Sequence, residues 1–383
     1  MILNKFLERT EYSSYEDLYQ NFKLTIPDNF NFAYDVVDEY AKTEPKREAL
    51  VWCDDNDESH IFTFRDLSIA SQRTANFLVD QGIKKGDRVM LILRRRYEFW
   101  FFLLALHRIG AIAIPATNML AAEDLEYRFK AAEVKMIVSY DDPALQKEID
   151  TACDKTNIVE KRVTIGQSRQ NWINFYDEYE ICPPVFERPS GENAIKNDDI
   201  MVVYFTSGTS SNPKMVAHTY TYPLGHIVTA KYWQHVVDGG RHLTVAETGW
   251  AKALWGKIYG QWIAGSAVFT YDMKVFIPGK LLKDAGIQGD HLLRAADRLP
   301  LHIAARTRQV RPFEPQALHH RWRSPEPRHL QAIPGTDRPP HARRLRPDRT
   351  YAHHGQLRLE QAAPGFHGHA LSGLPHGNRE CRW

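Results

Sequence analysis

Short apolar runs that alternate with helix-like patterns constrain the fold of this 383-residue chain more than any other feature. Short runs rich in aliphatic residues, which are typical of buried strands, lie at residues 89–93, 111–115 and 135–140. Apolar residues recur at helical spacing over residues 61–82, 97–109 and 125–132, and a glycine marks the end of the first two segments. Strands that alternate with helices predict an α/β fold whose doubly wound parallel sheets are covered by helices.

The composition of the chain changes sharply after Lys283. Residues 284–383 contain 16 arginines, no lysine, 11 of the 17 histidines, 11 of the 21 prolines and only 17 leucine, isoleucine, valine and phenylalanine residues. Their formal charge is +7, against −5 for residues 1–283. So little apolar surface cannot offset a backbone ordering cost of about 1–2 kcal/mol per residue. We therefore predict a folded region over residues 1–283 and a disordered, Arg/His/Pro-rich tail over residues 284–383.

The overall composition argues against several classes of protein. Hydrophobic residues make up 43% of the chain and charged residues 25%, and the net charge of +2 indicates no particular partner. The four cysteines are scattered without a CxxC pair, so neither a disulfide framework nor a zinc ribbon is expected. The N-terminus is charged, and the most apolar stretch, residues 99–106, is too short to cross a bilayer. We predict a cytoplasmic protein with no membrane span and no metal site, and we leave its oligomeric state open.

The segment DIMVVYFTSGTSSNPKMVAH, residues 199–218, has the character of a phosphate-binding loop. A buried strand over residues 200–205 leads directly into a stretch rich in glycine and hydroxyl side chains. Gly208 permits close approach of the backbone to a ligand, successive N–H groups can form an anion nest, and Lys214 adds a mobile positive charge. Hydroxyl donors are available from Thr206, Ser207, Thr209, Ser210 and Ser211. The spacing is not that of a Walker A loop, and a plain polar turn after a core strand is the alternative interpretation.

The run TSGTSS followed by x-P-K resembles the phosphate-loop signature of the adenylate-forming (AMP-binding) enzymes. Ser211 stands where that family usually has glycine. The resemblance extends over residues 30–283, because GDRVMLIL and LHRIGAIAIPAT are similar to the family's first conserved block. By this resemblance, residues 1–283 form the N-terminal part of the large adenylation domain.

A second block points to one branch of the family. ETGWAKALWGKIYGQWIAGSAVF, residues 247–269, is similar to the segment that lines the acyl pocket of medium-chain and acetate-type acyl-CoA synthetases. The resemblance implies that Gly249 and Trp250 face the substrate, although Trp250 fits a core aromatic equally well. Trp255 and Trp262 are expected in the core.

The resemblance implies a two-step ligase. A carboxylate attacks the α-phosphate of Mg²⁺-bound ATP to give acyl-adenylate and pyrophosphate, and the thiolate of coenzyme A then displaces AMP. Residues 206–211 and Lys214 would hold the β- and γ-phosphates and stabilise the leaving pyrophosphate by pre-placed donors. ATP, Mg²⁺, coenzyme A and a small-molecule carboxylate are therefore the implied ligands.

Residues beyond Lys283 do not continue the family pattern. The family should show an aromatic-Gly-x-Thr-Glu motif for AMP and magnesium, an aspartate for the ribose, and a small C-terminal domain with the adenylation lysine. None of these motifs occurs in residues 284–383. This chain is therefore predicted to be truncated with respect to the family pattern and catalytically incomplete.

A shift of the reading frame accounts for the missing motifs. With common codons, residues 344–349 read one base later permit Gly-Phe-Gly-Gln-Thr-Glu. Residues 290–297 permit Thr-Thr-Phe-Cys-Ala-Pro-Pro-Thr, and residues 364–368 permit Pro-Gly-Ser-Met-Gly. All three resemble the family, in its order and with one offset. We predict a one-base shift near Lys283 or Asp284, arising in the gene or in its sequencing.

Two other readings of the tail remain open. An arginine-rich segment can bind nucleic acid without sequence preference, which would make the chain a nucleotide-binding remnant with a basic arm. The tail, however, has five aromatic residues and no lysine, whereas basic arms usually mix both cations. A metal site at His319-His320 or His353-His354 would lack supporting groups around its ligands. We therefore expect no specific nucleic-acid partner.

Overall fold

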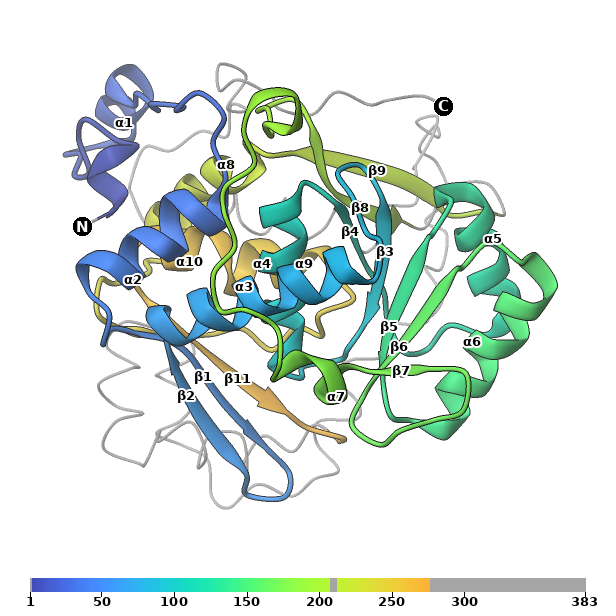
Figure 1. Cartoon of the computed structure of the whole chain (residues 1–383). Coiled ribbons are helices and arrows are strands. Elements are labelled where there is room, and N and C mark those ends of the chain that lie inside the picture. Colours follow the sequence, from blue (N-terminus) through green and yellow to red (C-terminus); the bar gives the residue numbers. More distant parts are fainter. Residues whose placement is uncertain (1, 207–211, 276–383) are drawn as a thin grey trace, which may run out of the picture. The chain divides into compact units, whose positions relative to one another are not determined.

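The computed structural model describes residues 2–206 and 212–275, which build two β-sheets with helices packed on them (Figure 1). Our predictions for the tail over residues 284–383, and for loop residues 207–211, lie outside the described residues.

The larger sheet has seven strands in the order β7-β6-β5-β3-β4-β8-β9. Its strands are β3 (Arg88–Ile92), β4 (Ile112–Pro115), β5 (Met136–Tyr140), β6 (Lys161–Ile165), β7 (Ile173–Asn174), β8 (Ile200–Thr206) and β9 (Lys214–Thr219). All neighbours run parallel except β8 and β9, which form an antiparallel hairpin. The predicted α/β class is confirmed, and β9 is an antiparallel addition to it.

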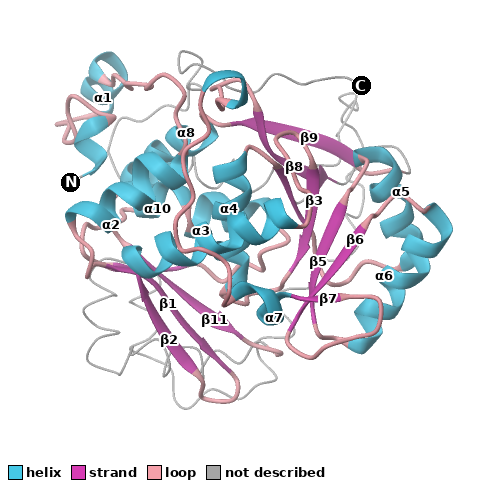
Figure 2. Ribbon diagram, in the orientation of Figure 1, coloured by secondary structure: helices cyan, strands magenta, loops and turns pink. Residues whose placement is uncertain are grey.

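The smaller sheet has four strands in the order β10-β11-β1-β2 (Figure 2). Its strands are β1 (Glu48–Asp54), β2 (Ser59–Thr63), β10 (Arg241–Leu243) and β11 (Ala267–Asp272). Strand β11 runs parallel to both β1 and β10, whereas β1 and β2 form a hairpin. Segments from both ends of the described chain therefore share one sheet.

Helices cover both faces of the larger sheet. The helices of the described residues are α1 (Tyr15–Asn21), α2 (Glu39–Thr43), α3 (Phe64–Asp80), α4 (Glu98–Ile109), α5 (Ala122–Ala132), α6 (Pro143–Thr156), α7 (Phe175–Tyr179), α8 (Tyr222–Val228), α9 (Ala251–Lys257) and α10 (Tyr259–Ile263). Short 3₁₀ or π turns occur at η1 (Ile2–Lys5), η2 (Ala33–Asp38), η3 (Gly191–Asn193) and η4 (Thr229–Trp233). Helices α3 and α4 lie between the two sheets, and α5 and α6 cover the opposite face of the larger one (Figure 1).

Helix α4 shows how the sequence places the core. Every one of its residues is buried, as expected for a helix with a sheet on either side. It ends at Gly110, whose φ of 80° is the left-handed conformation that glycine adopts without steric cost. The predicted end of this helix is therefore confirmed.

The predicted start of α3 is wrong by three residues. Residues 61–63 belong to β2, and the helix begins at Phe64. The Thr63 hydroxyl accepts from the Asp66 N–H at 3.2 Å, and the Asp66 carboxylate accepts from the Thr63 N–H at 2.9 Å. This reciprocal capping box fixes the boundary, and it overrides the apolar spacing that extends through Ile61.

Candidate functional site

The candidate site lies where the larger sheet ends. Strands β3, β4 and β8 are parallel neighbours, so the segments that follow them leave the sheet at the same edge. In open α/β sheets, ligands bind outside the carboxyl ends of the strands. The segments after β3, β4 and β8 therefore form the candidate site.

The predicted phosphate loop is the connection of a β-hairpin. Thr206 pairs with Lys214 across β8 and β9, and the Thr206 hydroxyl lies 3.4 Å from the Lys214 carbonyl oxygen. Both side chains are exposed. Of the residues proposed to hold phosphate, the structure thus brings Thr206 and Lys214 together at the base of the loop, and the remainder lie outside the described residues.

Sequence analysis missed strand β9. Its burial alternates between exposed and half-buried positions over its first four residues, which is the period-two pattern of an edge strand. The sequence carries no such alternation, because Met215, Val216 and Ala217 are consecutive apolar residues, so the strand left no period-two signal to find.

Helix α5 supports the C-terminal end of the loop. The Tyr127 hydroxyl donates to the Pro213 carbonyl oxygen at 3.0 Å. The Tyr127 ring also meets the Phe205 ring edge to face, with centroids 6.3 Å apart. The Arg128 guanidinium lies 5.3 Å from the centroid of the Phe205 ring. These contacts tie both strands of the hairpin to one helix, next to Lys214. Sequence analysis did not single out Tyr127 or Arg128, because only the tertiary fold brings them to the loop.

Gly249 contacts the backbone at the end of β4. A Cβ atom at this position would lie 2.4 Å from the Ala116 carbonyl carbon and 2.4 Å from the Thr117 nitrogen. Only glycine permits this approach without displacement of one backbone segment. The structure therefore gives Gly249 a packing role, and its contact with a substrate stays a prediction.

Thr248 fixes the same segment to the loop after β3. Its backbone N–H donates to the Arg94 carbonyl oxygen at 3.1 Å, and its hydroxyl donates to the same oxygen. The Arg94 guanidinium in turn donates to the Met273 carbonyl oxygen at 2.8 Å and pairs with the Asp272 carboxylate at 3.2 Å. Burial raises the pKa of Asp272, and the nearby Arg94 guanidinium acts in the opposite direction. The ends of β3 and β11 and the segment before α9 therefore meet at one place.

Trp250 is exposed at this place. Its side chain retains 55% of its accessible surface, and the residue directly precedes α9. Trp262, by contrast, is fully buried and donates its indole N–H to the Ala49 carbonyl oxygen at 2.9 Å. Trp255 is half-buried, with its ring 5.8 Å from that of Trp233. The core interpretation therefore holds for Trp262 and does not hold for Trp250.

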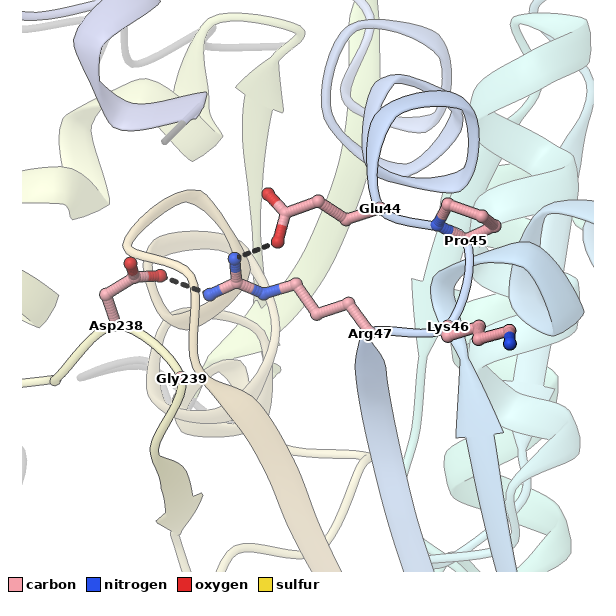
Figure 3. A pocket seen from close by; sticks show the side chains of 6 residues that line it. All are labelled: Glu44, Pro45, Lys46, Arg47, Asp238 and Gly239. Carbon is pink, nitrogen blue, oxygen red and sulfur yellow. Dashed lines mark hydrogen bonds and ion pairs between the residues drawn. The ribbon is translucent and has the colours of Figure 1, made fainter.

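A separate surface hollow of about 510 Å³ lies at the amino ends of β1 and β10 (Figure 3). Arg47 crosses it and pairs with Glu44 at 2.8 Å and with Asp238. The same guanidinium donates to the Gly265 carbonyl oxygen. These polar groups satisfy one another, and the hollow lies at the opposite end of β11 from Asp272, so it is not part of the candidate site.

Residues 2–206 and 212–275 contain neither a metal-binding cluster nor a membrane-spanning helix. No three histidine, cysteine, aspartate or glutamate side chains in these ranges lie where they could hold a metal ion. No helix within the same ranges is long and apolar enough to cross a membrane.

Comparison with known proteins identifies the class. Residues 37–286 match the family described as AMP-binding enzymes. The match covers more than half of the chain, and the chain therefore belongs to this family, as the loop signature indicated. The boundary at residue 283 itself stays a prediction.

The curated relatives are acyl-CoA synthetases. The human mitochondrial acyl-coenzyme A synthetase ACSM3 is 33% identical over 291 residues, which covers 73% of this chain and 48% of that protein. The rat mitochondrial acyl-coenzyme A synthetase ACSM5 is 33% identical over 261 residues, covering 66% and 44%. The expected branch is thus confirmed, and the chain spans about half the length of the curated relatives it matches.

Solved structures share the fold. A Brucella canis acyl-CoA synthetase matches with a TM-score of 0.60 and 22% identity, over 67% of this chain and 46% of that one. The anthranilate CoA ligase AuaEII, crystallised with anthranoyl-AMP, matches with a TM-score of 0.58 and 20% identity, over 67% and 48%. The two sheets and their helices are therefore those of the adenylate-forming acyl-CoA synthetases.

Proposed function

We propose that this chain carries the phosphate-binding and acyl-binding segments of an ATP-dependent acid–thiol ligase. The observation that supports the proposal is topological. Strands β4 and β8 are parallel neighbours in the sheet, so the segment that holds Gly249 and the loop that ends at Lys214 lie at the same edge. The positions of Thr206 and Lys214 after β8, and of the exposed Trp250 next to Gly249 near the end of β4, support this proposal in a domain of the AMP-binding family.

The proposed reaction has two steps. A carboxylate oxygen bonds to the α-phosphorus of ATP while the bond to the β-phosphate breaks, which releases pyrophosphate. The sulfur of coenzyme A then bonds to the acyl carbon while AMP leaves. Thr206, Lys214 and the donors at 207–211 hold the β- and γ-phosphates and stabilise the charge on pyrophosphate as it leaves.

We propose that Mg²⁺ arrives bound to ATP, as part of the substrate. Residues 2–206 and 212–275 contain no cluster of side chains that could hold a resident metal ion. We propose short- or medium-chain acids as the carboxylate, because the 247–269 block resembles that branch. We retain a cytoplasmic location as a proposal. The relatives named above are described as mitochondrial, so imaging of the tagged chain in cells decides between the two compartments.

The 383-residue chain itself is proposed to be catalytically incomplete. Residues 284–383 lack the motifs expected to grip AMP, magnesium and ribose, and also the adenylation lysine. Groups that act together in catalysis lose almost all activity when they are removed together. Any affinity for nucleotide then rests on the hairpin loop.

Lys214 provides the test of this loop. Lys214→Ala should weaken binding of a fluorescent ATP analogue to the 383-residue chain about tenfold, because a hydrogen bond to a charged group contributes about 1.5–3 kcal/mol. Lys42→Ala, at an exposed position on α2, is the matched control and should bind as the parent does. Equal binding by the parent and Lys214→Ala would contradict the proposed role of the loop.

A further inference from the structure

A buried group of charged side chains lies directly behind the segment that carries Trp250. Lys257 is the last residue of α9 and is 1% exposed. Its ammonium group donates to the Ala246 carbonyl oxygen at 3.1 Å and lies 5.9 Å from the centroid of the Trp100 ring. An ammonium group removed from water in this way needs charged or polar partners nearby.

Glu247 is a second charged side chain that binds the backbone before Trp250. One carboxylate oxygen accepts from the Gly249 N–H at 3.0 Å. The other is buried, and within the described part of the chain it has no hydrogen-bond partner. Burial raises the pKa of Glu247 to about 6, and the Gly249 N–H, Arg95 and Lys257 act against that rise. The carboxylate therefore binds the backbone just before Trp250.

Arg95 completes the group from the loop after β3. Its Nε atom is buried without a hydrogen-bond partner among the described residues. Burial lowers the pKa of Lys257 to about 7, Arg95 lowers it further, and the carboxylates of Glu247 and Asp272 oppose this. Arg95 and Glu247 thus act on the charge of Lys257 in opposite directions, and removal of the carboxylate would leave the buried cations with less compensation.

These contacts hold four consecutive residues. Lys257 holds the carbonyl group of Ala246, and Glu247 holds the N–H of Gly249. Thr248 is bound to Arg94, and Gly249 rests on the end of β4. Trp250, the next residue, is exposed, so its direction is set by the residues that precede it.

We propose that Lys257 and Glu247 are a buried positioning pair: together they fix residues 246–249 and so determine how Trp250 is presented at the site. Where the pair affects the choice of carboxylic acid, the inference rests on the proposed ligase function. The fixing of the segment itself does not depend on that function. Neither side chain touches a reacting atom in this account.

The first test uses the 383-residue chain and does not require activity. Lys257→Met keeps the length of the side chain without its charge, and Glu247→Gln keeps the shape of the carboxylate. Each single variant should speed hydrogen exchange of the backbone amides at 246–250 about tenfold. In the double variant, the increase in exchange rate should be smaller than the two single increases combined. Lys42→Met, at an exposed position on α2, is the control and should exchange at 246–250 as the parent does.

The outcomes separate a local role from a general one. Unchanged exchange in all variants would overturn the proposal. Global unfolding of all three variants, with Lys42→Met folded, would also overturn it, because the pair would then support the whole domain. Unfolding of the single variants with a folded double variant would support the coupling between the two charges.

A second test addresses the carboxylic acid. In an active ligase obtained by restoring the reading frame, Lys257→Met should raise KM for the acid severalfold and leave KM for ATP unchanged. A proportional change in both would contradict a role in presenting Trp250. If the restored parent makes no acyl-adenylate, the proposed function fails, and the exchange data on the 383-residue chain still decide the fate of the pair.

Discussion

Gly249 is the residue whose identity the structure constrains most directly. A Cβ atom there would lie 2.4 Å from two backbone atoms of Ala116 and Thr117, closer than any ordinary contact. Gly249→Ala should therefore displace one segment and lower the free energy of unfolding by about 1–3 kcal/mol, as measured by urea denaturation. Gly225→Ala is the matched control, because nothing lies within 4 Å of its added Cβ and alanine favours its helix. Equal stabilities for the two variants would show that the β4 contact is not tight.

The Tyr127 hydroxyl group connects helix α5 to the β8–β9 hairpin. Tyr127→Phe removes the donor to the Pro213 carbonyl oxygen and keeps the ring that meets Phe205. The loss of one such hydrogen bond costs about 1 kcal/mol. Hydrogen exchange of the amides in β9 should quicken about fivefold, while the amides of β5 should stay as in the parent. Unaltered exchange in β9 would mean that α5 does not support the hairpin.

At the scale of the elements, the sequence predicted those helices and strands whose apolar residues follow a local pattern. Strands β3, β4, β5 and β8 and helix α4 were predicted because each is an apolar run or a helical pattern with a clear end. The start of α3 was wrong because a capping box at Thr63 outweighs apolar spacing.

The candidate site was only partly predictable. Lys214 was singled out through a loop signature, which is local in sequence, whereas the role of Gly208, outside the described residues, stays a prediction. The contacts of Arg94, Tyr127 and Lys257 were not found, because each joins segments more than ten residues apart and leaves no period in the sequence. Their identification required the tertiary structure.

At the scale of the molecule, four histidines that are wholly or partly buried predict sensitivity to acid. Burial lowers the pKa of His107 and His226 to about 3, and that of His218 and His242 to about 4, from an ordinary 6.5. Below pH 6.5 the unfolded chain therefore binds protons that the folded chain does not. The stability is fully present above pH 6.5 and is lost as the pH falls towards 4, by up to about 1.4 kcal/mol per pH unit for each histidine.

Urea denaturation of the 383-residue chain at intervals from pH 8 to pH 5 measures this effect. The midpoint should be level above pH 7 and should fall steeply below pH 6.5. His107→Gln should make the fall shallower, because it removes one of the four titrating groups. A midpoint that stays constant down to pH 5 would contradict the neutral state assigned to these histidines.

The largest-scale prediction concerns the gene. Residues 284–383 contain no lysine, and three of their segments, read one base later, permit motifs of the AMP-binding family in the family's order. The family match ends at residue 286, close to where the composition changes. We therefore expect a one-base insertion or deletion close to the codon for Lys283. Nucleotide sequence whose codons cannot spell those motifs in any frame would exclude this explanation.

Adding or deleting one base near codon 283 should restore a ligase, provided that the downstream gene is complete. The restored frame would supply the groups for AMP, magnesium and ribose that residues 284–383 lack. These groups would act together with the residues of the β8–β9 hairpin that are proposed to bind phosphate. The restored enzyme should exchange labelled pyrophosphate with ATP only when a short- or medium-chain carboxylic acid is present, and the 383-residue chain should not. Robust acyl-CoA synthesis by the 383-residue chain would refute the proposed incompleteness, because it would show that the missing motifs are not needed for catalysis.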